Sequence, residues 1–249
     1  DIVVEMPVVT GSITRMMAIF ICEDPKEIGS VRSARHDFIP LAQGFDAIFA
    51  HWGGSHFALT ELKNDVVDNL DAFPNYFDAF YRKAGIPAPH NGFTSMERMI
   101  NAAEKLGYRM TSEFKGYKFL SNKIQIANYK TQAVELRYGS AYNVRYEYNP
   151  ARNSYLRWRG EEEEVDALTG RQVETRNVVV MRAESRQIDK DYNDVDILGV
   201  GKAIVYRNGE ETIGTWAKKK AQDMLRFYDE RGVEVVFAPG KIWINIIEP

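Results

Sequence analysis

The sequence predicts an α+β protein with an N-terminal α/β domain, residues 1–118, followed by a mostly antiparallel β domain, residues 119–249. Apolar residues recur at helical spacing in several stretches before residue 107. From about residue 119 they occur instead in short β-branched and aromatic runs separated by turn residues, as in a sandwich or an open barrel. A chain of 249 residues is long enough to bury the cores of two such domains.

Composition narrows the class of protein. Hydrophobic residues make up 45% and charged residues 27% of the chain, which is ordinary for a globular protein and argues against disorder. No apolar run approaches the roughly 18 residues of a membrane helix. The net charge of −3 offers no basic field for nucleic acid, so we expect no nucleic-acid partner. Cys22 is the single cysteine, and its apolar neighbours predict a buried thiol.

In the first half we expect a hairpin from residues 2–9 and 13–22, and then three helices. The first helix has Ser30 as N-cap and ends at Gly44. A buried strand over residues 47–50 then runs through the turn His51-Trp52-Gly53-Gly54-Ser55 into a second helix that extends to Leu70. Thr94 and Glu97 form a capping box for the third helix, residues 96–106.

In the second half the pattern predicts a series of short strands. Asn208-Gly209 is a strong hairpin signal within this series. The expected strands are residues 124–128, 133–137, 144–148, 155–159, 178–183, 202–206, 224–228, 233–237 and 242–247.

Two arginines occupy unusual positions in the first predicted helix. Arg32 and Arg35 would stand in its first turns, where cations oppose the helix dipole, and Arg35 would lie beside the apolar stripe. A partly buried guanidinium needs a carboxylate or an anionic ligand. Glu5 and Asp24 are the candidate internal partners, so a structural ion-pair network and an anion site both remain open. Arg15 is a third arginine of this half in an apolar setting.

The glycine turn is the second candidate feature. Gly53 and Gly54 at the start of a helix would offer backbone N–H groups to a phosphate or a carboxylate, although a simple tight turn has the same pattern. A nucleotide site is disfavoured, because the chain has neither a Walker lysine nor G-x-G-x-x-G. A nucleophile elbow is also disfavoured, because Phe57 stands where G-x-S-x-G has its closing glycine.

Histidines near this turn could supply a catalytic base. We expect His51, His56 and His90 to lie in one pocket with Ser55 and Asn91, which would allow a serine nucleophile with a histidine base. Histidines satisfied within the structure are the alternative. The histidine spacing matches no metal-binding pattern, so we expect no metal and no cofactor.

Aromatic residues of the second half also allow two interpretations. Tyr146 and Tyr148 share one strand face, and Tyr155 and Trp158 lie in the expected partner strand. They could form an exposed face that stacks on sugars or bases, or they could be ordinary core packing.

Several short motifs occur in an order that resembles one family. They are Gly29-Ser30-Val31-Arg32-Ser33-Ala34-Arg35, Phe45-Asp46-Ala47-Ile48, His51-x-Gly53-Gly54-Ser55, Pro89-His90-Asn91, Gly199-x-Gly201-Lys202-Ala203, Asn208-Gly209, Gly214-Thr215-Trp216 and Pro239-Gly240-x-x-Trp243-Ile244. Together they resemble the YerB-like bacterial lipoproteins, domain of unknown function 3048, with separate N- and C-terminal domains. The resemblance implies a secreted protein, typically of Gram-positive bacteria, tethered to the outer face of the cytoplasmic membrane by a lipidated N-terminal cysteine that this chain does not include. It implies no reaction.

These observations lead to two functional hypotheses. The first is an extracytoplasmic, envelope-associated binding or scaffold protein that recognises an anionic group on a cell-wall component or an envelope protein. Its ligand-binding residues would be Arg15, Arg32, Arg35, Gly53, Gly54 and Asn91. The second is a hydrolase acting on cell-wall material, with Ser55 as nucleophile and His51 or His90 as base.

Overall fold

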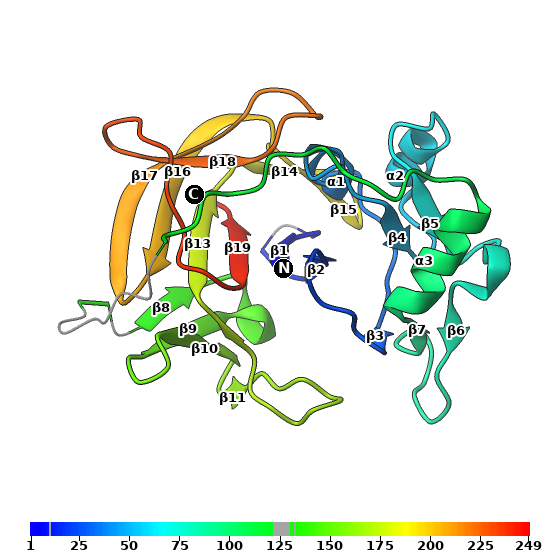
Figure 1. Ribbon diagram of the computed structural model, residues 1–249, viewed down its shortest axis with the longest axis horizontal. Helices are drawn as coiled ribbons and strands as arrows, with labels where there is room; N and C mark the ends of the chain where they lie inside the picture. The colour runs from blue at the N-terminus through cyan, green and yellow to red at the C-terminus, as the bar shows by residue number, and fades with distance from the viewer. Residues whose placement is uncertain (10, 122–129, 132) are drawn as a thin grey trace. The chain divides into compact units, whose positions relative to one another are not determined.

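The chain folds into two compact units, shown in a computed structural model that describes residues 1–9, 11–121, 130–131 and 133–249 (Figure 1). The β unit comprises Asp1–Ile19, Gly116–Lys219 and Leu225–Pro249. The α/β unit comprises Phe20–Lys115 and Lys220–Met224. The segment expected as one domain, residues 1–118, is therefore divided between the two units, because the first hairpin pairs with the last strand of the chain.

The larger sheet of the β unit has seven strands among the described residues. It contains both ends of the chain, and its strands are antiparallel except where β19 lies parallel to its two neighbours. In sheet order they are β18 (Arg226–Asp229), β17 (Glu210–Lys218), β16 (Gly199–Arg207), β13 (Asn177–Arg182), β19 (Ile242–Ile247), β1 (Ile2–Pro7) and β2 (Thr14–Ile19).

The sequence of β19 accounts for its place inside this sheet. The run Ile242–Ile247 is apolar at nearly every position, and all six residues are buried. Strands buried on both faces read as continuous apolar runs rather than alternating ones. The one amide in the run, Asn245, stays satisfied: it donates to Val179 O at 3.1 Å and accepts from the Tyr146 hydroxyl at 3.1 Å.

A smaller sheet packs on one face of the larger one. Tyr146, Tyr148 and Tyr155 project from it into a core shared with Val180 and Trp243 of the larger sheet, so these tyrosines are core residues. Its strands are β8 (Ala133–Leu136), β9 (Val144–Asn149), β10 (Ser154–Arg159), β11 (Glu162–Glu163) and β12 (Glu174–Thr175); the remaining elements of the unit are the 3-10 turn η2 (Ser140–Tyr142) and the hairpin β14 (Ser185–Asp189) with β15 (Tyr192–Val195).

The α/β unit is built from short elements around a small apolar core. Leu70, Ala72, Ala79, Phe80 and Ala102 form this core, with Trp52 and Met99 packed against it. The elements are β3 (Ile28–Gly29), α1 (Phe38–Gly44), β4 (Phe49–His51), α2 (His56–Leu62), β5 (Asn69–Asp71), the 3-10 turn η1 (Tyr76–Asp78), β6 (Tyr81–Arg82), β7 (Gly92–Thr94) and α3 (Met96–Lys105). With the β unit, they make the protein α+β, as expected.

Two of the predicted helices are shorter than expected. Residues 31–34 are not helical, because neighbouring segments take their backbone hydrogen bonds: Val31 N donates to Gly92 O at 2.7 Å, and Trp52 N donates to Arg32 O at 3.0 Å. The first helix therefore begins only at Phe38. The second ends at Leu62, and Leu70 lies instead in β5, which returns parallel to β4.

Smaller predictions also need correction. The N-cap of α3 is Ser95, whose Oγ accepts from Arg98 N at 3.2 Å, whereas Thr94 belongs to β7. Residues 233–237 contribute two isolated bridges, Tyr228 with Glu234 and Phe119 with Phe237, rather than a strand. Cys22 is exposed rather than buried. The strand expected over residues 124–128 lies outside the described residues.

Candidate functional site

The glycine turn after β4 binds a carboxylate of the protein itself. Gly53 adopts a left-handed conformation with φ of +61°, which glycine accommodates without steric cost, and its amide donates to Asp71 Oδ1 at 2.8 Å. The amide at the end of the turn, Ser55 N, donates to Ala34 O at 3.1 Å. Gly54 forms a bridge with Ala34. The turn that we expected to receive a ligand anion is thus bonded to Asp71 and to the segment before α1.

Ser55 and His51 are structural in this arrangement. The Ser55 side chain is buried and caps α2, with Oγ accepting from Ala58 N at 3.1 Å. His51 is also buried, with Nδ1 2.8 Å from Gly53 O and Nε2 3.2 Å from Asn69 Oδ1. Among the described hydrogen bonds, none joins Ser55 to His51 or to His90. A nucleophile–base pair needs such contact, so this geometry lacks the first requirement of the hydrolase hypothesis.

Three of the predicted residues do meet on the surface of the α/β unit. Arg32 Nη1 donates to His90 Nδ1 at 3.0 Å, and the next residue, Asn91, accepts from Arg82 Nη1 at 2.7 Å through Oδ1. The Arg82 guanidinium lies 4.6 Å from the centre of the Trp52 ring. We call Arg32, Trp52, Arg82, His90 and Asn91 the cationic patch.

A glycine allows this patch to form. Gly92 pairs with Arg82 across β6 and β7, and a side chain at Gly92 would meet the Trp52 ring, since a Cβ there would lie 2.4 Å from Cε3. Without that side chain the indole can approach the backbone at Gly92, and the guanidinium of Arg82 stacks on its ring. Sequence reasoning missed Trp52 and Arg82, because their contact depends on the pairing of two strands of two and three residues.

The remaining predicted arginines lie elsewhere. Arg35 Nη1 donates to Ala34 O at 3.1 Å, and Arg15 belongs to β2 of the β unit. Glu5, expected as their partner, is fully buried in the β unit and bonded to Arg157 Nη2 at 2.5 Å and Arg159 Nη2 at 2.9 Å. Asp24, the other candidate, pairs with Lys26 at 2.5 Å. The expected ion pair between Glu5 and the arginines of residues 32–35 is therefore wrong.

Trp158, which was considered with Tyr146, Tyr148 and Tyr155 as part of one stacking face, lies on the opposite face of its strand from Tyr155. Trp158 alternates with Tyr155 and Arg157 in β10, and the Arg145 guanidinium stands 4.6 Å from the centre of its ring. Arg145 in turn pairs with Glu147. The four aromatic residues therefore form no single stacking face.

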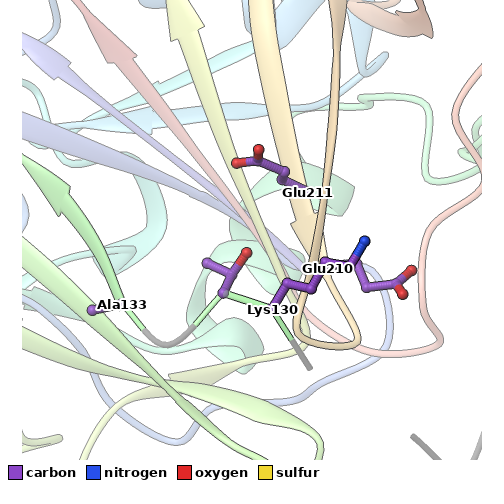
Figure 2. Close-up of a pocket in the computed structure, with 5 residues that line it drawn as sticks. Lys130, Ala133, Glu210 and Glu211 are labelled. Carbon is purple, nitrogen blue, oxygen red and sulfur yellow. The ribbon is translucent and has the colours of Figure 1, made fainter. Parts of the chain in front are cut away.

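A surface pocket of about 750 Å³ lies in the β unit, beside the turn between β16 and β17 (Figure 2). Lys130, Thr131, Ala133, Glu210 and Glu211 line it. Figure 2 shows the carboxylates of Glu210 and Glu211 pointing in different directions, so they do not converge on one ligand position. The cationic patch is the stronger candidate site.

Comparisons with known proteins agree on one family. Residues 1–109 match the model described as the N-terminal domain of a protein of unknown function (DUF3048), and residues 134–244 match the C-terminal domain of the same description. A Bacillus subtilis (strain 168) protein named "Putative lipoprotein YerB" is 32% identical over 251 residues, which cover 99% of this chain and 74% of the relative. The crystal structure of YerB from Bacillus subtilis matches with a TM-score of 0.89 and 30% identity, over 99% of this chain and 83% of that chain.

In the described part of the chain, no helix is long and apolar enough to cross a membrane.

Proposed function

We propose that this chain, which belongs to the DUF3048 family of proteins of unknown function, is an extracytoplasmic binding or scaffold protein that recognises an anionic group through its cationic patch. The name of its Bacillus subtilis relative supports the location, on the outer face of the cytoplasmic membrane. The ligand would then be an anionic group of a cell-wall component or of an envelope protein.

The observation that carries the proposal is that the two arginines of the patch are held by neutral groups. Arg32 bonds the His90 ring, and Arg82 bonds the Asn91 amide and stacks on Trp52. Within the described residues, neither forms an ion pair with a carboxylate. Arg109 of the same unit, by contrast, pairs with Asp46. The positive charges of the patch are therefore ordered and not neutralised, which favours an anion that accepts from a guanidinium.

The proposal is tested with polyglutamate as a simple polyanion. Binding to the full chain is measured by calorimetry at low and at high salt, and Arg32→Gln and Arg82→Gln are each expected to weaken it about tenfold, the effect of one hydrogen bond to a charged group. Added salt should weaken binding of the unchanged protein.

The matched control is Arg231→Gln, which removes an exposed arginine of the β unit. Because Arg231 is outside the patch, its replacement should leave polyglutamate binding unchanged. Equal losses in the control and in the patch variants would show that only net charge matters, and would contradict a defined anion site.

A further inference from the structure

We propose that the ligand of the cationic patch is an acidic polysaccharide, and that the loop before β6 provides aromatic side chains on which its sugar rings stack. This inference rests on the proposed function, since the patch would bind the acidic groups of the same polymer. Its own evidence lies in residues 73–78, which the patch does not include.

Three large aromatic side chains of this loop face the solvent. Phe73 is 62% exposed, Tyr76 57% and Phe77 47%. A single exposed aromatic residue needs no explanation, but three within five positions concentrate exposed apolar side chains on one loop, which favours a binding site there. We call Phe73, Tyr76 and Phe77 the aromatic loop.

The loop is held in one conformation by internal bonds. Asn75 takes a left-handed φ of 57° and bonds Phe80 in both directions: its Nδ2 donates to Phe80 O at 3.1 Å, and its Oδ1 accepts from Phe80 N at 2.8 Å. Asp71 Oδ1 accepts from Phe73 N at 3.0 Å, and Arg98 donates to Asp78 O at 2.6 Å. Rings displayed on a fixed backbone lose little entropy when they bind a ligand.

The backbone of the loop carries strain as well. Phe77 and Asp78 have φ values of 57° and 55°, in the left-handed region that side-chain-bearing residues seldom adopt. Such conformations persist only where surrounding contacts impose them, and they concentrate at binding sites. The strain thus falls on Phe77 itself, whose ring centre lies 5.4 Å from Lys105 Nζ.

The aromatic loop is continuous with the cationic patch. The Phe73 and Trp52 rings meet edge to face, with centroids 6.1 Å apart, and Arg82 covers Trp52. Asp71 also ties the loop to the glycine turn that follows Trp52, because its Oδ1 accepts from both Gly53 N and Phe73 N. A polymer with an acidic group at Arg82 would therefore place its neighbouring unit at Phe73.

The surrounding charges favour a glycan over an anionic membrane. Asp78 follows Phe77 directly in the loop, and Asp65 and Asp68 belong to the preceding segment of the same unit. Asp65, Asp68 and Asp78 are exposed. These carboxylates would repel an anionic bilayer that inserted the loop. An acidic polysaccharide can instead place its acidic groups at the arginines of the patch and its hydroxyls at these carboxylates, which accept hydrogen bonds.

The test compares polymers on the full chain. Polygalacturonate carries a carboxylate on each sugar ring, polyglutamate carries carboxylates without sugars, and phosphatidylglycerol vesicles present an anionic bilayer. We expect polygalacturonate to bind at least tenfold more tightly than polyglutamate at equal charge concentration and equal salt, because stacking adds to the ionic contacts.

Variants then separate the two features. The double substitution Tyr76→Ala with Phe77→Ala should remove the preference for polygalacturonate and leave polyglutamate binding unchanged, while Phe119→Ala, which removes an exposed aromatic residue of the β unit, should change neither. Circular dichroism and thermal unfolding of each variant verify that it is folded.

The outcomes are distinct for the two proposals. Equal binding of the two polymers, unaffected by the double substitution, would overturn the polysaccharide inference and keep the anion site. Stronger binding to the vesicles than to polygalacturonate would overturn it in favour of a membrane surface. If neither polymer binds, the anion site fails, and the inference fails with it.

Discussion

Arg157 and Glu5 form an ion pair in which both side chains are completely buried, with Arg157 Nη2 2.5 Å from Glu5 Oε2. The guanidinium also lies 4.0 Å from the centre of the Trp243 ring and donates to Glu164 and Tyr146. Burial opposes the charge of Arg157, but the groups around it, Tyr146, Glu5 and Glu164, outweigh burial and raise its pKa above the ordinary arginine value. The pair links β1 to β10 and thereby fixes the smaller sheet on the larger one.

Removing one member of this pair should be costly. Arg157→Met is expected to lower the free energy of unfolding by about 3–5 kcal/mol, because it leaves the Glu5 charge buried with less compensation. Glu5→Leu should have a similar effect, and the double variant should lose less than the sum of the two. The measurement is denaturant unfolding followed by tryptophan fluorescence. Lys118→Met, which breaks the exposed pair with Glu234, is the control and should cost less than about 1 kcal/mol. Strict additivity of the two buried changes would argue against a coupled pair.

Ser55 should contribute to stability and not to catalysis. Ser55→Ala removes the N-cap of α2 and is expected to cost about 1 kcal/mol, as is Ser95→Ala at the start of α3. Thermal unfolding measures both. Polyglutamate binding should stay as in the unchanged protein. A hydrolytic activity on cell-wall material that disappears with Ser55→Ala, and persists with Ser95→Ala, would instead revive the serine–histidine hypothesis.

Asp46 should make the local structure of residues 112–114 dependent on pH. The Arg109 guanidinium, assisted by the Ser112 hydroxyl and the Glu113 amide, holds the pKa of the Asp46 carboxyl below its usual range. A carboxyl with a lowered pKa in the folded protein contributes stability above its unfolded pKa, and this contribution is lost as the pH falls through the folded value.

The test of this prediction follows the Glu113 amide by NMR between neutral and strongly acidic pH. Its resonance should shift as Asp46 is protonated, at a pH below the ordinary aspartate pKa of 3.8. Asp46→Asn should abolish the shift while tolerating the left-handed backbone of residue 46, whose φ is 52°. A transition that persists in Asp46→Asn would assign it to another group.

Gly92→Ala should disrupt the cationic patch by displacing the Trp52 ring. The new methyl group would overlap the Trp52 ring, so Trp52 and Arg82 must move, and we expect a loss of about 1–3 kcal/mol in the free energy of unfolding. Polyglutamate binding should weaken as well, measured on folded protein. Gly85→Asn is the control, because that loop position has a φ of +80° and open space around it, which asparagine accepts. Unchanged binding in Gly92→Ala would show that Trp52 does not position Arg82.

The sequence motifs were sufficient to identify the family, and both domain matches confirm that identification. They were less informative about the residues within it. The helix-dipole argument for Arg32 and Arg35 requires a helix that includes them, but residues 31–34 are not helical and α1 begins only at Phe38, so the argument does not apply. The partner expected for these arginines, Glu5, has Arg157 and Arg159 instead, more than 150 residues away along the chain. Spacing within one segment carries no information about such distant pairs.

The sequence by itself determined the local elements: the first hairpin, the α3 helix, the hairpin at Asn208-Gly209 and the apolar last strand, because propensity, capping and turn residues act over a few positions. Tertiary structure alone decided three further features. It paired the first hairpin with β19, the last strand of the chain, it placed Arg82 over the Trp52 ring, and it bonded the Gly53 amide to Asp71. Each of these depends on which distant segments bury their apolar faces together, a choice that a local pattern leaves open.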